Sequence, residues 1–485
     1  MASSDQVLLD IVKYVYHYEI QSEASFRRAR ELLIDSLGCA VESLDDRGLR
    51  SIIGMPVAGT IVPNGFRLPG TNLELDPVKG AFDLGSMIRY LDHNDALPGA
   101  EWGHPSDNLG AILATMDWLA RSSSQSVGPP MTIRTLLVAM IKAYEIQGCF
   151  QIANSFNALG IDHVILIKVA STPILSWLMG LSEDQAVAAL SQAFMDGHPL
   201  RTYRAAPNTI SRKGWAAGDA CMRAVHLTLL TRAGQDGAPH PLTVPRWGFY
   251  DALFRQQLFQ FPKPYREDVV QRAVVKLIAC EGHGITAVEA ALKLGTELAA
   301  RGLDPARSIE RIDIRTHKPA MTIIDKTGDL VNAADRDHCM QYVVAVALLK
   351  GRVIEVADYK DSSPWATDPR VTELRSKMFL REDEEFTKAY YVLEKLSAAT
   401  GITVHLNDGS QLDEAVIHVP VGHPLSTNDL DGINIQTKFA KNLRRRYTEE
   451  EVSVLQTALE NDHLPVDAYV DLWRRPDYPS LLKVL

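Results

Sequence analysis

Histidine and carboxylate residues gather in one short stretch of the sequence, YLDHNDALPGAEWGHPSDNLG at residues 90–110. Its acid/base groups are Asp92, His93, Asp95, Glu101, His104 and Asp107. Proline and glycine break the stretch, and apolar runs with helical spacing lie on both sides of it. A solvated loop with two helix caps would explain the turn residues alone. The density of histidine beside carboxylate favours a site between two rigid helices, where reactive side chains are often held.

Two further segments place a histidine or several cations before an expected helix. His163 precedes the apolar run 165–180, where a helix dipole would lower the pKa of its imidazole, although a capping or packing role is the simpler alternative. The segment HPLRTYRAAPNTISRKGWAAGD, residues 198–219, contains Arg201, Arg204, Arg212 and Lys213. Cations at the start of a helix form an anion pocket, and a solvated basic face is the alternative.

Lys276 lies in the apolar run VVKLIAC, which we predict to be a strand, and Glu281 and His283 follow it. The lysine would either reach solvent from the strand end or point into a cleft, where burial would shift its pKa. A second polar cluster lies in NAADRDHCMQY, residues 332–342, at the start of an expected helix. That cluster is explained equally well as a capping network and as a site.

Several common catalytic motifs do not occur in the sequence. It has no GxGxxG placed after a strand, no Walker loop and no GxSxG elbow, so nucleotide chemistry and serine hydrolysis lack their usual signatures. The groups that do occur are histidine, aspartate and lysine beside arginine. They suit removal of a proton next to a carboxylate, followed by elimination, decarboxylation or isomerisation.

Composition narrows the classes of protein and partner. The chain has 485 residues, 46% of them hydrophobic and 23% charged, as in a globular protein of two or three domains. Its net charge of −10 makes a nucleic-acid partner unexpected. The five scattered cysteines argue against a structural metal or an iron–sulfur cluster and for a reducing compartment. We find no targeting segment and no apolar run that would cross a bilayer, so we expect a cytoplasmic protein without a membrane partner.

The hydrophobic pattern predicts a mainly helical chain with an α+β segment. Residues 5–45 predict two helices, 50–76 one or two short strands or an extended loop, and 77–233 mostly helices. Beyond the strand 274–280 we predict a helix at 285–301, a strand at 309–316, a helix at 337–349 and a β-hairpin at 403–419. The predicted organisation is a helical domain at 1–272, an α+β domain at 273–428, and helices at 429–485 that return to the first domain.

Longer motifs in these regions resemble one family. VAGTIVPNGFRLPGT, AEWGHPSDNLG, NSFNALGIDHVILIKVAST, RTYRAAPNTISRKGWAAGDA and ADRDHCMQY closely resemble motifs of the MmgE/PrpD family, and within it the iron–sulfur-independent 2-methylcitrate dehydratases. The resemblance covers nearly the whole chain. It implies a large all-helical domain, a smaller α+β lid with the active site between them, a homodimer, and no cofactor or metal.

Carried over by position, the resemblance places the family's catalytic residues on Asp92, His104, His163, Lys213 and Lys276. It implies a tricarboxylate substrate, which Lys213, Arg204 and Arg212 would hold. His104 or His163 would transfer protons, oriented by Asp92. Related cis-aconitate decarboxylases share these residues, so a decarboxylase and an isomerase stay open beside the dehydratase.

The sequence departs from the family at two places that we expect to contact the substrate. DHNDALPG stands where DHNDTW or DFNDTW is usual, so Ala96 replaces a threonine and Leu97 a tryptophan. ACEGHGITA, which contains His283, stands where FPAEFHSQTA is usual. A smaller apolar wall suggests a longer alkyl chain than methyl, and therefore an alkylcitrate dehydratase. The lost threonine hydroxyl also leaves open a catalytically silent homologue.

Overall fold

The first two predicted helices are present and separate where the pattern breaks. The computed structural model describes residues 5–57, 59–122, 127–205, 209–392, 394–427, 430 and 432–475. Helix α1 spans Gln6–His17 and α2 spans Glu23–Ser43. The Ser22 side chain accepts a hydrogen bond from the Ser25 backbone N–H, which caps α2.

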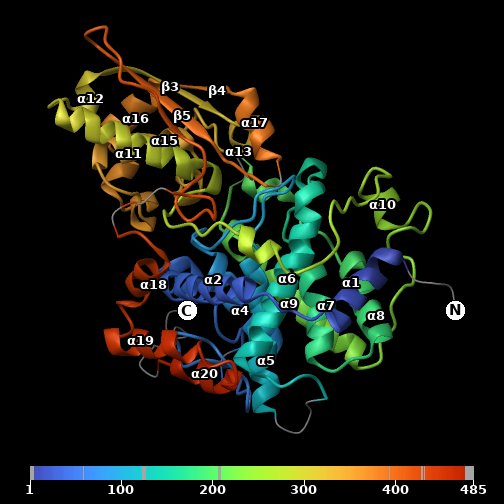
Figure 1. The fold of residues 1–485 in the computed structure, drawn as a ribbon. Coiled ribbons are helices and arrows are strands. Elements are labelled where there is room, and N and C mark those ends of the chain that lie inside the picture. Colours follow the sequence, from blue (N-terminus) through green and yellow to red (C-terminus); the bar gives the residue numbers. More distant parts are fainter. Residues whose placement is uncertain are drawn as a thin grey trace. The chain divides into compact units, whose positions relative to one another are not determined.

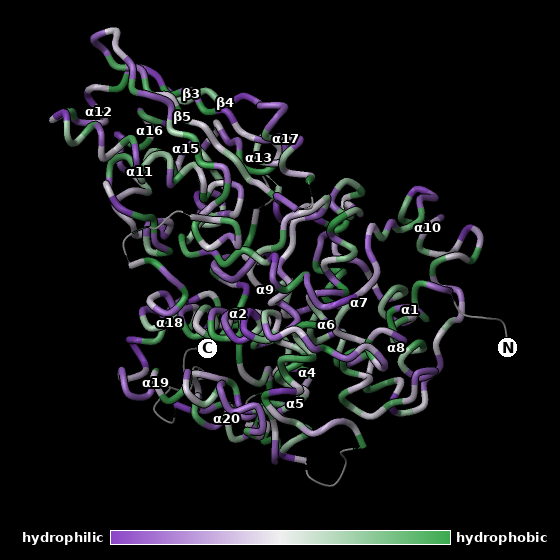
Figure 2. The backbone as a smooth tube through the Cα atoms, in the orientation of Figure 1, coloured by the Kyte–Doolittle hydropathy of each residue, from purple (hydrophilic) through white to green (hydrophobic). Residues whose placement is uncertain are grey.

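The chain divides into two units (Figure 1). Unit 1 takes residues 1–201, 214–273 and 435–485, and unit 2 takes 202–213 and 274–434. The segment 202–213, which the predicted boundaries place in the helical domain, is therefore part of unit 2. Figure 2 shows hydrophilic and hydrophobic stretches alternating along the chain in both units, as expected when each helix buries one face.

Among the residues that the structure describes, the strands of unit 1 are one short antiparallel pair, β1 and β2, within the 50–76 region predicted to hold short strands or an extended loop. Its remaining α-helices and strands in the described part of the chain are α3 (Arg47–Arg50), β1 (Phe66–Arg67), β2 (Glu74–Leu75), α4 (Pro77–Arg89), α5 (Leu109–Arg121), α6 (Ile133–Ala153), α7 (Ile165–Leu178), α8 (Glu183–Met195), α9 (Arg212–Arg232), α10 (Phe249–Ala252), α18 (Ile435–Leu443), α19 (Glu449–Ala458) and α20 (Val466–Leu472).

Helix α6 forms much of the core of unit 1. By length and composition it is apolar enough to cross a bilayer, contrary to our expectation that no such run exists. Within its most apolar window, however, 83% of the residues are buried inside the structure. Helix α6 thus behaves as the core helix of a globular unit, and the neighbouring α7 is buried along nearly its whole length.

Unit 2 is built on a four-stranded sheet in the order β4-β3-β5-β6. Strand β3 (Ile309–Thr316) pairs in parallel with β4 (Met378–Glu382) and antiparallel with β5 (Thr400–Leu406), which pairs antiparallel with β6 (Ala415–Ile417). The helices of unit 2 are α11 (Ile285–Ala300), α12 (Pro305–Ser308), α13 (Lys318–Ile323), α14 (Ala333–Arg336), α15 (Met340–Lys350), α16 (Pro369–Ser376) and α17 (Glu384–Tyr390). The predicted mainly helical fold with an α+β part is confirmed.

Two local predictions in unit 2 need correction, and one strand was missed. Residues 274–280 are not a strand, because this buried segment makes isolated backbone contacts such as the Val275 N–H to the Gly422 carbonyl at 3.2 Å. A run that is apolar on both sides does not distinguish strand from buried loop. Strand β4 was not predicted. Helix α15 begins at Met340, so Asp337 and His338 lie in the turn after α14.

Candidate active site

The histidine-rich stretch 90–110 is folded against the end of α6. The Leu97 N–H donates to the Gly103 carbonyl at 2.8 Å, and the Glu101 N–H donates to the Gln151 carbonyl at 2.9 Å. A Cβ atom on Gly99 would lie 2.6 Å from that Gln151 oxygen, which explains why glycine occupies this position. The side chains of Asp92, His93, Asp95, Glu101, His104 and Asp107 are all buried. The interpretation as a solvated loop is therefore wrong.

His104 is oriented by a backbone carbonyl. Its Nδ1 lies 2.6 Å from the Asp95 carbonyl oxygen, at the start of the 3₁₀ turn Pro105–Asn108. A carbonyl can only accept, so Nδ1 must carry a proton, and in the neutral ring Nε2 is then the basic nitrogen. His104 is thus preset to accept or donate a proton through Nε2.

A chain of buried amides holds the loop on either side of His104. The Ser171 hydroxyl donates to Asn108 Oδ1 at 2.7 Å, and Asn108 Nδ2 donates to Gln147 Oε1 at 2.6 Å. Gln147 Nε2 donates in turn to Gln151 Oε1 at 2.8 Å, and Gln151 Nε2 donates to the Leu97 carbonyl at 3.0 Å. Because a buried amide without partners is costly, this network fixes the loop on α6 and α7.

His163 lies beside His104, with the ring centroids 5.5 Å apart. It precedes α7, as predicted, and its Nδ1 is 3.4 Å from Asp162 Oδ1. Arg201 is 3.9 Å from the other oxygen of Asp162. Both imidazoles are almost fully buried. Two neighbouring imidazoles do not readily both carry a charge, so the pair suits one acid and one base.

Asp92 occupies a strained backbone position at the start of the loop 90–110. Its φ of +51° is in the left-handed region, which aspartate tolerates better than most residues. Asp92 Oδ1 accepts from Arg89 Nη1 at 2.5 Å, and both side chains are buried. A strained residue held by a buried ion pair is a common feature of functional sites.

Two carboxyl groups of the loop have raised pKa values. Burial raises the pKa of Asp95 to about 6, against the opposing hydrogen bond from Ser106. Burial also raises the pKa of Glu101 to about 7, against the charge of Arg201. Both groups therefore change protonation near neutral pH, as perturbed groups of active sites often do.

Ala96 and Leu97 are fully buried, but they do not have the same surroundings. The Leu97 side chain packs against α6, because a Cβ atom on Gly148 would lie 2.8 Å from Leu97 Cδ2. The same hypothetical atom would lie 2.4 Å from Val269. Leu97 is therefore part of the packing between the loop and α6, and Ala96 is the better candidate for a residue that limits substrate size.

In unit 2, Lys213 forms a buried pair with the turn after α14. Lys213 Nζ donates to the two Asp337 carboxylate oxygens at 2.9 and 2.8 Å, and it lies 3.0 Å from His338 Nδ1. His338 Nδ1 is in turn 2.6 Å from Asp337 Oδ1. The sequence already showed Asp337 and His338 as a polar cluster, but not that this cluster pairs with Lys213.

Lys276 and His283 both lower the pKa of Glu281. Burial would raise the pKa of Glu281, but the hydrogen bond and electrostatic interaction with His283, together with His338 and Lys276, hold it well below its usual range. His283 Nδ1 lies 2.9 Å from Glu281 Oε1, and its Nε2 lies 3.3 Å from the Tyr390 hydroxyl. His283, which we predicted to contact the substrate, is buried, and each of its ring nitrogens has a protein partner.

Arg204 and Arg212, the two arginines predicted to bind an anion, both contact the Tyr203 ring. The guanidinium carbons of Arg204 and Arg212 are 5.2 and 5.5 Å from the Tyr203 ring centroid. Arg212 also begins α9, where the first backbone N–H groups favour negative charge. Unit 2 therefore groups Arg204, Arg212 and Lys213 in one segment, and unit 1 groups Asp92, His104 and His163.

Comparisons with known proteins place the chain in a family. The MmgE/PrpD N-terminal domain matches residues 9–262, and the MmgE/PrpD C-terminal domain matches residues 278–464. The chain belongs to the MmgE/PrpD family, as the sequence motifs indicated.

Relatives with assigned names match over nearly their full length. Alkylcitrate dehydratase phiI of a fungal species (strain ATCC 74256) is 50% identical, covering 98% of this chain and 95% of that protein. The 2-methylcitrate dehydratase-like protein oryR of Aspergillus oryzae is 51% identical, covering 97% and 96%. The 2-methylcitrate dehydratase of Escherichia coli is 46% identical, covering 97% of each chain.

Proposed function

We propose that this protein is a hydro-lyase that removes water from 2-methylcitrate or a longer 2-alkylcitrate to give a cis-aconitate-type alkene. The observation that carries the proposal is the buried His104–His163 pair, in a chain whose full-length relatives are named dehydratases. In this reaction a C–H bond beside a carboxylate and the C–O bond of the neighbouring hydroxyl break. A C=C bond forms, and the proton and hydroxyl leave as water.

The proposed roles follow from the contacts of each side chain. One imidazole of the pair removes the proton and the other, protonated, donates to the departing hydroxyl. The Asp95 carbonyl orients His104, and Asp162 lies beside His163, while Asp92 is held by Arg89. Lys213, Lys276, Arg204 and Arg212 supply positive charge for the substrate carboxylates, and no cofactor takes part.

A direct assay tests this function. Purified protein with chelator is given 2-methylcitrate and a long-chain alkylcitrate, and the conjugated alkene is followed by ultraviolet absorbance while evolved CO₂ is measured. We expect alkene without CO₂, and turnover about 10²- to 10⁴-fold lower in His104→Gln. His226→Gln, an exposed histidine on α9, is the matched control and should leave turnover unchanged. CO₂ release would indicate a decarboxylase, and a folded protein without alkene would leave an isomerase or a silent homologue.

We propose further that Ala96 admits an alkyl chain longer than methyl. Ala96→Thr and Ala96→Val add side chains of equal size, and only threonine adds a hydroxyl. If size decides, both variants should lower the preference for the long-chain substrate, by about 10-fold or more in kcat/KM. A fall in Ala96→Thr alone would assign the effect to the hydroxyl, and no change in either would contradict the proposed role.

Homodimer formation and a cytoplasmic location, both expected from the sequence, stay predictions. Analytical ultracentrifugation tests the first, and cell fractionation tests the second.

A further inference from the structure

A lysine from the last part of the chain is buried against the loop that carries the histidines. Lys438 lies on α18, and its side chain is 4% exposed. Its Nζ is 2.6 Å from Asp35 Oδ1 on α2 and donates to the His93 backbone carbonyl at 2.7 Å. A single ammonium group therefore connects three segments of unit 1 that are far apart in the sequence.

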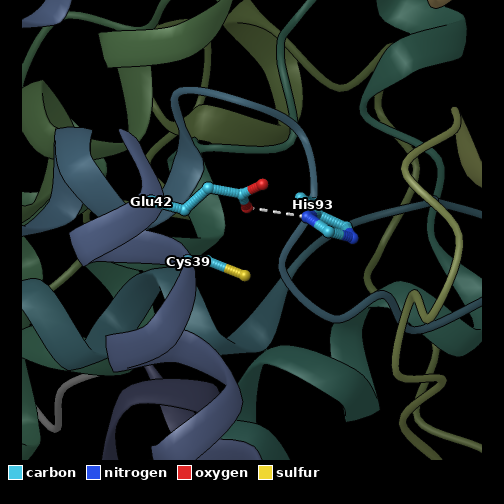
Figure 3. A group of neighbouring side chains, drawn as sticks. All are labelled: Cys39, Glu42 and His93. Carbon is cyan, nitrogen blue, oxygen red and sulfur yellow. Dashed lines mark hydrogen bonds and ion pairs between the residues drawn. The ribbon is translucent and has the colours of Figure 1, made fainter. Parts of the chain in front are cut away.

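The same place contains a group of side chains that resembles a metal site (Figure 3). Cys39 and Glu42 come from one face of α2, and His93 comes from the loop, with its Nδ1 2.8 Å from Glu42 Oε2. One ligand atom from each of the three residues lies within 4.8 Å of the others. Cysteine, histidine and carboxylate are ligands that zinc accepts.

The charges around this group argue against a metal ion. Burial raises the pKa of the Cys39 thiol well above its usual value, although Lys438 opposes the shift. Burial and the charge of Lys438 both lower the pKa of His93. A bound cation would need the thiolate and would lie beside a buried ammonium group. Lys438 pairs with Asp35 at 2.6 Å, and Glu42 pairs with His93 at 2.8 Å and is also stabilised by the charge of Lys438. Asp35, Glu42, His93 and Lys438 therefore form a buried polar network that already contains a positive charge.

We propose that Lys438 is a positioning residue for His104, an inference that rests on the proposed function. Its hydrogen bond fixes the His93 carbonyl, two residues before the Asp95 carbonyl that orients His104. Between them Asn94 is also fixed, because its Nδ2 donates to Ser106 Oγ and Asp107 Oδ1, both at 2.9 Å. A displacement of the His93 carbonyl is therefore passed along the loop to the imidazole.

Single removal of Lys438 would leave Asp35 as an unpaired buried charge and endanger the fold. The test therefore uses the double variant Asp35→Leu/Lys438→Met, which removes both charges and the donor to His93. Asp35→Asn is the matched control: it keeps Lys438 and its donor to His93, and it leaves the ammonium an amide oxygen at position 35 and the favourable charge of Glu42. Lys438→Arg keeps the charge and the donors. Each variant is compared with the wild type for thermal unfolding and for kcat and KM in the dehydratase assay.

We expect the folded double variant to lose about 10- to 100-fold in kcat with KM nearly unchanged, because a small displacement of a catalytic group lowers turnover. The control Asp35→Asn should keep kcat, and Lys438→Arg should keep most of it. Wild-type kcat in the folded double variant, or an equal loss in Asp35→Asn, would overturn the inference. The inference would also be overturned if the wild type bound one equivalent of zinc tightly and Cys39→Ser did not, because Cys39, Glu42 and His93 would then form a metal site.

A second readout separates this inference from the proposed function. In protein labelled with ¹⁵N-histidine, the signal of His104, assigned with His104→Gln, should show the Nδ1–H tautomer in the wild type. The folded double variant should alter that signal, because the hydrogen bond to the His93 carbonyl is lost. Lys438→Arg, which keeps a donor, should leave the signal as in the wild type. An inactive wild type would refute the dehydratase function, whereas an unchanged His104 signal in the folded double variant would refute the positioning role.

Discussion

Replacing Glu101 by glutamine should change how stability depends on pH. The Glu101 side chain is 1% exposed, and it accepts a hydrogen bond from the Asn157 N–H at 2.8 Å. Burial raises its pKa from 4.5 to about 7. Glutamine has the same shape and keeps an acceptor oxygen for Asn157, but it does not ionise. The variant therefore isolates the cost of ionising this buried carboxyl group.

The size of the effect follows from the shift in pKa. The folded protein binds the proton more tightly than the unfolded chain, so this stabilisation is present at low pH and is lost as pH rises from 4.5 to about 7. The whole shift corresponds to about 3 kcal/mol. Between pH 5.5 and 8, wild type should lose about 2 kcal/mol of unfolding free energy relative to Glu101→Gln.

Urea unfolding of both proteins at several pH values between 5.5 and 8 measures this difference. Following the stability of wild type relative to the variant cancels the contributions of the other titrating groups. Glu19→Gln, at an exposed position, is the control and should follow wild type at every pH. Parallel curves for wild type and Glu101→Gln would refute the assigned pKa and the cause given for it.

Two further predictions concern the loop and the lysine pair. Gly99→Ala would place a Cβ atom 2.6 Å from the Gln151 carbonyl oxygen, so the loop must move. We expect the free energy of unfolding to fall by about 1–3 kcal/mol and kcat to fall with it. An unchanged melting temperature would contradict the packing described. Asp337→Asn removes the carboxylate charge that pairs with Lys213 at 2.8 Å. Because the lysine is then no longer held in place, KM for a tricarboxylate should rise by about 10-fold. An unchanged KM in substrate titrations would argue that Lys213 does not bind substrate.

The helices and the central strand could be predicted because their signals are local. Ser22 before α2 is a capping residue, and the alternating run Ile309–Thr316 has the same bounds as β3, although a register shift between Ile309 and Arg311 interrupts its alternation. Strand β4 could not be predicted, because its exposed Phe379 and charged residues show no clear alternation and the pairing with β3 is long-range. The run 274–280 was wrongly predicted to be a strand, because its apolar residues fill a buried loop and such a run does not distinguish the two.

The candidate site was predictable in its residues but not in its contacts. His104 and His163 could be named from sequence, whereas the 5.5 Å between their rings depends on how α6 and α7 pack. The backbone carbonyl of Asp95 leaves no trace in the sequence at all, because any residue type supplies a carbonyl. Lys438 was missed for a similar reason, since it lies far from the loop in the sequence and carries no motif.

Unit 1 is built from segments at both ends of the chain, which affects when it can finish folding during translation. Helix α2 emerges from the ribosome early, while α18, which neutralises Asp35, follows only after all of residues 274–434. Most of unit 2 is continuous in sequence and can fold before α18 is made. Until α18 is made, the Asp35 carboxylate lacks its ammonium partner, so the burial of this part of α2 is completed only near the end of translation, hundreds of residues after α2 itself.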